Sequence, residues 1–156
     1  QLNKKTKAKS ISRKSLKNTK KESQNWYVPL RNTIFLNYAS ALAESISLKS
    51  GFKPDIFVGF KNEGQESYPD TTSQFVKQMN KLNSIGSQSN PKILAPLIKK
   101  DKEDIISLAI KLKVPLEKTY SCYSGTKKHC GYCLACKLRQ EGFYWANQKD
   151  PTLYQN

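Results

Sequence analysis

The sequence predicts an α/β fold in which part of a doubly wound parallel sheet is followed by a metal-binding loop and a helix. Two observations support this prediction. Apolar segments with helical and strand-like patterns alternate between residues 32 and 113, and four cysteines gather between residues 122 and 136. At 156 residues the chain is long enough for one domain, and no apolar run approaches the roughly 18 residues of a membrane-spanning helix.

The first predicted element is an amphipathic helix that begins at Asn32 or Thr33 and continues to about Ser50. Apolar residues recur there at steps of three and four, which is the spacing of one helix face. Gly51 is the expected stop, because glycine readily takes the left-handed conformation that ends many helices. The predicted apolar face consists of Phe35, Ala39, Leu42, Ala43 and Ile46.

Two short apolar runs are predicted to be strands. Residues 55–60 are rich in β-formers and predict a buried strand, and residues 92–95 predict a second one. Between them, Thr71 and Gln74 have the spacing of a capping box, so a helix is expected from there to about Asn83.

Two further helices complete the predicted order. Asp101 is expected to cap a helix over residues 102–113 that ends before Pro115, and a final helix should run from about Leu134 to Gln148. The order helix, strand, helix, strand, helix predicts a parallel sheet with helices on its faces, because parallel strands need crossover connections. The inner face of the helix over residues 102–113 is predicted to be Ile105, Leu108, Ala109 and Leu112.

The cysteines predict a metal site. The chain has four, Cys122, Cys130, Cys133 and Cys136, and the last three form two overlapping C-x-x-C steps. One Zn²⁺ accepts four thiolates, and such a closed set leaves no open position, so the predicted zinc is structural. Two disulfides, unrelated buried thiols, or His129 as a competing ligand are the alternatives. No signal peptide is visible, so reduced thiols and a cytoplasmic location are expected.

The start of the chain differs in composition from the rest. Residues 1–25 hold nine basic residues and one acidic residue, so they carry eight of the fifteen net positive charges. With few large apolar residues this segment is expected to be a disordered tail or the remnant of a loop. A nucleic-acid-binding arm or a transit peptide are the alternatives. The segment has no aromatic residue, which disfavours nucleic acid. The chain begins with Gln1, so a fragment or a processed product is also open.

Five stretches of the chain, in order, resemble the 7-cyano-7-deazaguanine synthase family of the queuosine pathway. The resemblance covers nearly all of residues 26–152. It implies that residues 26–156 are the C-terminal half of a domain with the adenine nucleotide alpha hydrolase-like fold. The stretches are WYVPLRNTIFLNYA (26–39), DIFVGF (55–60), YPD (68–70), APLIKKDKEDI (95–105) and TYSCY to CKLRQEGF (119–143).

The resemblance implies an ATP-dependent ligase that converts 7-carboxy-7-deazaguanine and ammonia to the nitrile, with one structural zinc per chain and a homo-oligomeric assembly. Arg31, Asn32 and Asp70 are the candidate substrate-binding residues. Arg31 suits a carboxylate or phosphate because its guanidinium is a planar bidentate donor, although a structural ion pair is the alternative. Asp70 either accepts hydrogen bonds from the guanine-like edge or caps the helix that follows it. No catalytic residue is identified.

The glycine-rich ATP loop of this family, SGGxDS, has no counterpart here. The chain contains no Gly-Gly pair and its first glycine is Gly51, so ATP and Mg²⁺ are expected only with a separate N-terminal half. Gly64, Ser67, Thr71 and Leu134-Ala135 depart from the family pattern, which leaves the exact substrate open. A diverged, non-catalytic paralogue that binds a base or a partner protein, and a basic zinc module that binds nucleic acid, are the competing hypotheses.

Overall fold

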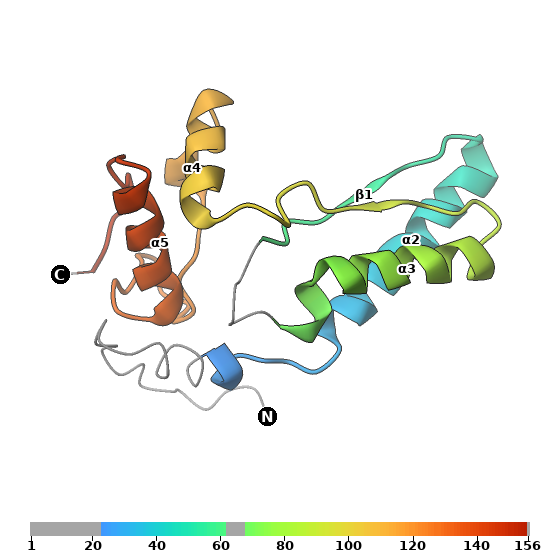
Figure 1. Ribbon diagram of the computed structural model, residues 1–156, viewed down its shortest axis with the longest axis horizontal. Coiled ribbons are helices and arrows are strands. Elements are labelled where there is room, and N and C mark those ends of the chain that lie inside the picture. The colour runs from blue at the N-terminus through green and yellow to red at the C-terminus, as the bar shows by residue number, and fades with distance from the viewer. Residues whose placement is uncertain (1–22, 62–67, 156) are drawn as a thin grey trace. The chain divides into compact units, whose positions relative to one another are not determined.

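The structure, a computed structural model, describes residues 23–61 and 68–155 (Figure 1). They form two compact units. One is Tyr27–Lys100, and the other joins Asp101–Asn156 to the segment that ends at Trp26. Most of the predicted tail lies outside the described residues, and so do Gly64 and Ser67, whereas residues 23–25 form a short helical turn. No helix in the described ranges is long and apolar enough to cross a bilayer.

The unit Tyr27–Lys100 begins with helix α2 (Arg31–Ser50). Gly51 ends it as predicted, with φ of 74° and its N–H donated to the carbonyl of Ser47. The predicted apolar face is only partly right, since Ala43 is buried but Phe35 is 62% and Leu42 54% exposed. The helix is rotated because two polar side chains are buried through hydrogen bonds to distant residues, which apolar spacing does not reveal. The buried residues are Asn32, Leu36, Ser40 and Ala43.

The sheet of this unit has two parallel strands, β1 (Ile56–Phe57) and β2 (Ile93–Leu94). Ile56 lies opposite Ile93, and Phe57 lies opposite Leu94. The prediction of parallel pairing is confirmed. Both strands are shorter than predicted, and β1 is not buried on both faces, because the Phe57 side chain is 69% exposed.

Helix α3 (Ser73–Gly86) connects the two strands. The predicted cap is wrong by one residue. Thr72 is the N-cap and its hydroxyl accepts from the Phe75 N–H, whereas Thr71 belongs to the preceding 3-10 turn η2 (Pro69–Thr71). Helices α2 and α3 lie side by side along β1 in Figure 1 and share one core with the sheet. That core consists of Leu36, Met79 and Ile93, with Ile56, Val58, Phe60, Phe75 and Val76 packed against it.

In the other unit, helix α4 (Lys102–Lys111) packs against helix α5 (Leu134–Trp145), and the short η3 turn (Leu116–Lys118) lies between them in sequence. The predicted cap is confirmed, since Asp101 and Asp104 form a capping box. Helix α4 ends two residues earlier than predicted, where the chain turns into the left-handed conformation at Lys113.

The inner face of α4 is also only partly as predicted. Ile106 and Ala109 are buried, whereas Leu112 follows the end of the helix and is 65% exposed. Gly142 of α5 allows the close approach of α4, because a Cβ at this position would lie 2.8 Å from Cβ of Lys102. The two helices are therefore held together at a point where no larger residue fits.

Candidate functional site

The four predicted cysteine ligands come together in one buried cluster. The Sγ atoms of Cys122, Cys130, Cys133 and Cys136 all lie within 4.8 Å of one another, and all four cysteines are free thiols. Cys133 is the N-cap of α5 and Cys136 lies in its first turn, so the helix fixes two of the four sulfurs. The cluster could hold a metal ion, and the disulfide alternative is not seen.

Backbone N–H groups point at the sulfurs of this cluster. Cys122 Sγ accepts from the N–H of Cys130 at 3.3 Å and of Ser124 at 3.4 Å, and Cys130 Sγ accepts from the N–H of Cys133 at 3.3 Å. Burial opposes ionisation of Cys122, but these donors lower its pKa to about 6, and the pKa of Cys130 is lowered as well. Burial raises the pKa of Cys133 and of Cys136. The neighbourhood thus favours two thiolates, and a bound cation would favour all four.

His129 does not take part in this cluster. Its Nε2 accepts the backbone N–H of Ser121 at 2.9 Å, and its ring lies against Tyr120 with the centroids 4.6 Å apart. Burial, together with the nearby charge of Arg139, lowers the pKa of His129, which favours the neutral imidazole whose Nε2 accepts this hydrogen bond. The histidine therefore positions the loop around the cysteines. The candidate metal ligands that the structure brings together are the four cysteine sulfurs.

An ion pair that the sequence analysis did not identify ties the end of the chain to this site. Arg139 Nε lies 3.2 Å from Asp150 Oδ1, and the Arg139 side chain is buried while that of Asp150 is only 11% exposed. Tyr154 donates its hydroxyl to Asp150 Oδ2 at 2.5 Å, and Arg139 Nη1 donates to Thr119 Oγ1 at 2.7 Å. Arg139 lies in one of the stretches that carry the family resemblance, but nothing in its sequence neighbourhood points to a partner eleven residues away.

The same tail forms backbone hydrogen bonds beside the cysteines. His129 donates its N–H to the carbonyl of Leu153 at 3.3 Å, and Gln155 donates its N–H to the carbonyl of His129 at 2.8 Å. These bonds place the tail along the residue that precedes Cys130. The ion pair and the backbone bonds together hold the loop that carries the first two sulfurs.

Two of the three predicted substrate-binding residues lie in direct contact in the unit Tyr27–Lys100. Asn32 donates its backbone N–H to Asp70 Oδ2 at 3.1 Å and its Nδ2 to the Asp70 carbonyl at 3.2 Å, and both side chains are buried. Leu30, the N-cap of α2, offers no capping side chain, so Asp70 supplies the acceptor for the first turn of α2. The helix that follows Asp70 is capped by Thr72 instead. Arg31, next to Asn32, is exposed.

These residues lie where ligands usually bind in a parallel α/β sheet. Helix α3 is the crossover from β1 to β2, so its start, with Asp70 just before it, lies beyond the carboxyl end of β1. Ligands of such sheets bind outside the carboxyl ends of the strands. Tyr27 and Tyr68 add a pair of nearly parallel aromatic rings in the same unit, with centroids 5.8 Å apart and an interplanar angle of 14°.

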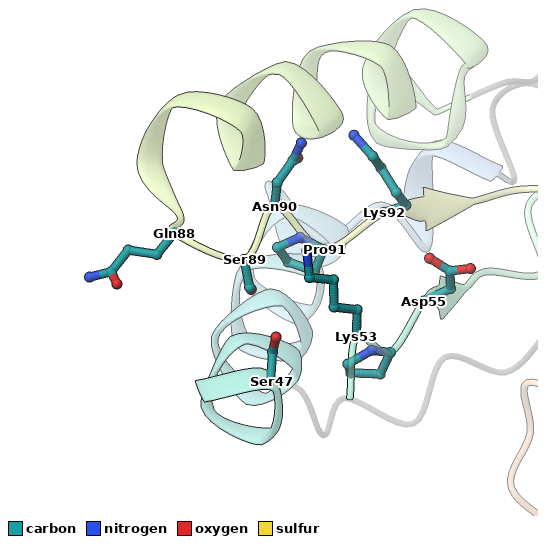
Figure 2. Close-up of a pocket in the computed structure, with 9 residues that line it drawn as sticks. Ser47, Lys53, Asp55, Gln88, Ser89, Asn90, Pro91 and Lys92 are labelled. Atoms are coloured by element: carbon teal, nitrogen blue, oxygen red, sulfur yellow. The ribbon is translucent and has the colours of Figure 1, made fainter. Parts of the chain in front are cut away.

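A separate hollow of about 370 Å³ lies at the other end of the strands, where β1 and β2 begin (Figure 2). Its lining comes from the end of α2 and from the segments that directly precede β1 and β2, so it lies at the amino ends of the strands. This position makes it the weaker candidate for a substrate site. The residues around it are Ser47, Lys53, Pro54, Asp55, Gln88, Ser89, Asn90, Pro91 and Lys92.

Comparison with known proteins identifies the family of this chain. The family model described as queuosine biosynthesis protein QueC matches residues 2–147. The chain belongs to the QueC family. This confirms the resemblance drawn from the five sequence stretches, and the nucleic-acid module is not favoured.

Curated QueC relatives share about two fifths of the aligned residues with this chain. The 7-cyano-7-deazaguanine synthase of Methanothrix thermoacetophila is 43% identical over 133 residues, which cover 83% of this chain and 57% of the relative. The enzyme of the same name from Methanobrevibacter smithii is 38% identical over 128 residues, covering 82% and 54%. The Campylobacter curvus enzyme is 39% identical over 137 residues, covering 86% and 59%. The chain thus spans just over half the length of these QueC relatives.

Proposed function

We propose that this chain is the substrate-binding and metal-binding part of an ATP-dependent QueC ligase, which converts 7-carboxy-7-deazaguanine and ammonia to 7-cyano-7-deazaguanine in queuosine biosynthesis. The observation that carries the proposal is the similarity to 7-cyano-7-deazaguanine synthases, at 38–43% identity over more than four fifths of the chain. The small parallel sheet with its crossover helix supports an adenine nucleotide alpha hydrolase-like fold. Free thiols in the cysteine cluster support a cytoplasmic location.

The metal in this proposal is zinc with a structural role. A tetrahedral Zn²⁺ with Zn–S bonds of about 2.3 Å separates its sulfurs by about 3.8 Å. The Sγ atoms of Cys130 and Cys136 lie 3.9 Å apart, close to that value. Four thiolates would saturate the ion, so it would cross-link the loop that carries Cys122 and Cys130 to the start of α5 and leave no position for substrate.

The substrate in this proposal binds at the start of α2. Asp70 has one carboxylate oxygen engaged by the Asn32 N–H, and its second oxygen can accept from the N–H groups of a guanine-like edge. The exposed guanidinium of Arg31 lies in the first turn of α2, where the helix dipole also favours negative charge. Arg31 therefore suits the substrate carboxylate at which the reaction takes place.

ATP supplies the adenylyl group that activates this carboxylate. No residue pattern of this chain forms the glycine loop for it, so we propose that a segment that is not among these 156 residues holds ATP and Mg²⁺. The role of the chain's own residues is to orient the substrate carboxylate through Arg31 and to hold its base through Asn32 and Asp70. A homo-oligomeric assembly remains an expectation from the family.

A complementation experiment tests the proposed function. The full chain is co-expressed with the part of the Methanobrevibacter smithii synthase that it does not cover, and nitrile formation from 7-carboxy-7-deazaguanine, ammonia and ATP is followed by mass spectrometry. We expect turnover by the pair and none by either part alone. A stable, metal-loaded pair without any turnover would favour the diverged paralogue, in which Thr71 is among the positions that depart from the family pattern.

A further inference from the structure

Two tyrosines of the unit Tyr27–Lys100 form a stacked pair next to the proposed substrate-binding residues. The rings of Tyr27 and Tyr68 have their centroids 5.8 Å apart and an interplanar angle of 14°, which is the geometry of an offset parallel stack. Tyr68 is half-buried, whereas Tyr27 is 38% exposed. Tyr68 therefore supports one face of the Tyr27 ring and leaves Tyr27 as the outer, more accessible ring of the pair.

The two segments that carry these rings are joined a second time, by Asn32 and Asp70. Asn32 donates its backbone N–H to Asp70 Oδ2 at 3.1 Å. The carbonyl of Tyr68 accepts the N–H of Thr71 at 3.2 Å, and this bond closes the turn that carries both Tyr68 and Asp70. The aromatic pair and the Asp70 carboxylate therefore lie together, where the start of α2 meets the η2 turn.

A strained turn brings Tyr27 to this place. Arg31 donates its N–H to the carbonyl of Val28 at 3.3 Å, so a tight turn with Pro29 and Leu30 at its centre precedes α2. Leu30 has φ of 56° and ψ of 16°, a left-handed conformation that glycine usually takes in such turns. The Leu30 side chain is 62% exposed, so its own packing does not enforce this conformation. Backbone strain of this kind collects at ligand sites, and here it sets Tyr27 beside the first turn of α2.

We propose that Tyr27, backed by Tyr68, is the platform on which the flat base of the deazaguanine substrate stacks. The inference rests on the proposed function for the identity of this base. Hydrogen bonds from Asp70 reach only the edge of a planar base, and its two faces need an aromatic or apolar partner. A ring that a second ring already holds in place loses little further freedom when the base binds, so the contact is preorganised.

The platform has a kinetic signature that differs from that of Arg31. The base does not change during the reaction, so stacking stabilises the bound substrate and the transition state equally. Loss of such an interaction raises KM and leaves kcat unchanged. Arg31 is proposed to contact the reacting carboxylate, so its loss should lower kcat. The kinetic constant that changes therefore tells which of the two roles a side chain has.

A binding experiment tests the platform directly. The full chain, alone and paired with the part of the Methanobrevibacter smithii synthase that it does not cover, is titrated calorimetrically with 7-carboxy-7-deazaguanine without ATP. Tyr27→Leu keeps an apolar side chain but loses the ring, and it should bind roughly 5- to 150-fold more weakly, the range expected for one lost base stack. Tyr27→Phe keeps the ring and should bind within about twofold of the original chain. Tyr38→Leu is the matched control, because it removes a 75% exposed tyrosine of α2 and should leave the affinity unchanged.

Two further measurements separate stacking from support of the fold. A proton at the edge of a base that lies over an aromatic ring shifts upfield in NMR spectra. The carbon-bound ring proton of the ligand should show this shift with the original chain and with Tyr27→Phe, but not with Tyr27→Leu. In nitrile formation by the pair, Tyr27→Leu should raise KM at an unchanged kcat. A smaller fraction of folded protein would instead lower kcat and leave KM as it is, so KM reports on the platform even in a less stable variant.

Several outcomes would overturn the platform. They are the original affinity in Tyr27→Leu, a loss in Tyr27→Phe as large as that in Tyr27→Leu, a bound ligand without the upfield shift, and the absence of binding in both samples. The activity assay separates this inference from the proposed function. Ring-dependent binding by a pair that forms no nitrile supports the platform and counts against the function. Nitrile formation with an unchanged KM in Tyr27→Leu supports the function and refutes the platform.

Discussion

Asp150→Ala should destabilise the unit that carries the cysteine cluster, because it removes one partner of a buried ion pair. Arg139 Nε and Asp150 Oδ1 lie 3.2 Å apart with side-chain exposures of only 7% and 11%. Leaving a buried charge without its partner costs about 3–5 kcal/mol. Arg139 keeps hydrogen bonds to Thr119 and Leu116, so we expect the lower end, about 3 kcal/mol. For a chain of this size the loss corresponds to a fall in Tm of roughly 6–12 °C.

The pH dependence of stability provides an independent measurement. The partial burial of Asp150 alone would raise its pKa, but hydrogen bonds from Tyr154 and Thr152 and the charge of Arg139 lower the pKa below its usual 3.8. A carboxyl with a depressed pKa in the folded state contributes stability that is fully present above the unfolded pKa and is lost as the pH falls through the folded one. Acidification from neutral pH should therefore destabilise the original chain more than Asp150→Ala below about pH 4.

The assay is thermal unfolding of the metal-loaded chain, followed by circular dichroism, with metal content measured on the same samples. Asp55→Ala is the matched control, since it removes the same charge from an exposed side chain and should shift Tm by no more than about 2 °C. If Asp150→Ala unfolds at the temperature of the control, the ion pair contributes nothing measurable, and the view that it holds the loop of the metal site is refuted.

Three other perturbations have defined outcomes. Cys133→Ser should lose the metal and give insoluble or unfolded protein, because structural zinc sites contribute on the order of 10–16 kcal/mol, and a folded, metal-free variant with unchanged unfolding would contradict this. Gly142→Ala should lower stability by about 1–3 kcal/mol in denaturant titrations because its Cβ would meet Lys102, whereas Gly86→Ala, with no atom within 4 Å, is the control that should not. Arg31→Ala should leave unfolding unchanged but cost the assembled enzyme about 2–3 kcal/mol of transition-state stabilisation, measured as a fall in kcat/KM. A kcat/KM equal to that of the original chain would exclude a role for Arg31 at the substrate carboxylate.

Much of the local structure follows from the sequence alone. Asp101 with Asp104 and Gly51 mark helix ends through short-range hydrogen bonds and backbone preference, so a few neighbouring residues suffice to predict them. The four sulfurs were predictable for a similar reason, since C-x-x-C spacing brings cysteines together within one turn and the chain holds no others. Parallel pairing of the strands followed from the helix between them.

The tertiary structure alone decided which face of α2 is buried and which partners the polar side chains of α3 have. Asn32 and Ser40 are buried because they form hydrogen bonds with Asp70 and Asn83, which are 38 and 43 residues away in the chain. The spacing of apolar residues along the helix cannot predict such partners. Asn80 in the same way forms hydrogen bonds with the backbone of Ile93, 13 residues away. These features depend on hydrogen bonds between residues far apart in the chain, and the energy of such a bond exists only once the fold has brought its donor and acceptor together.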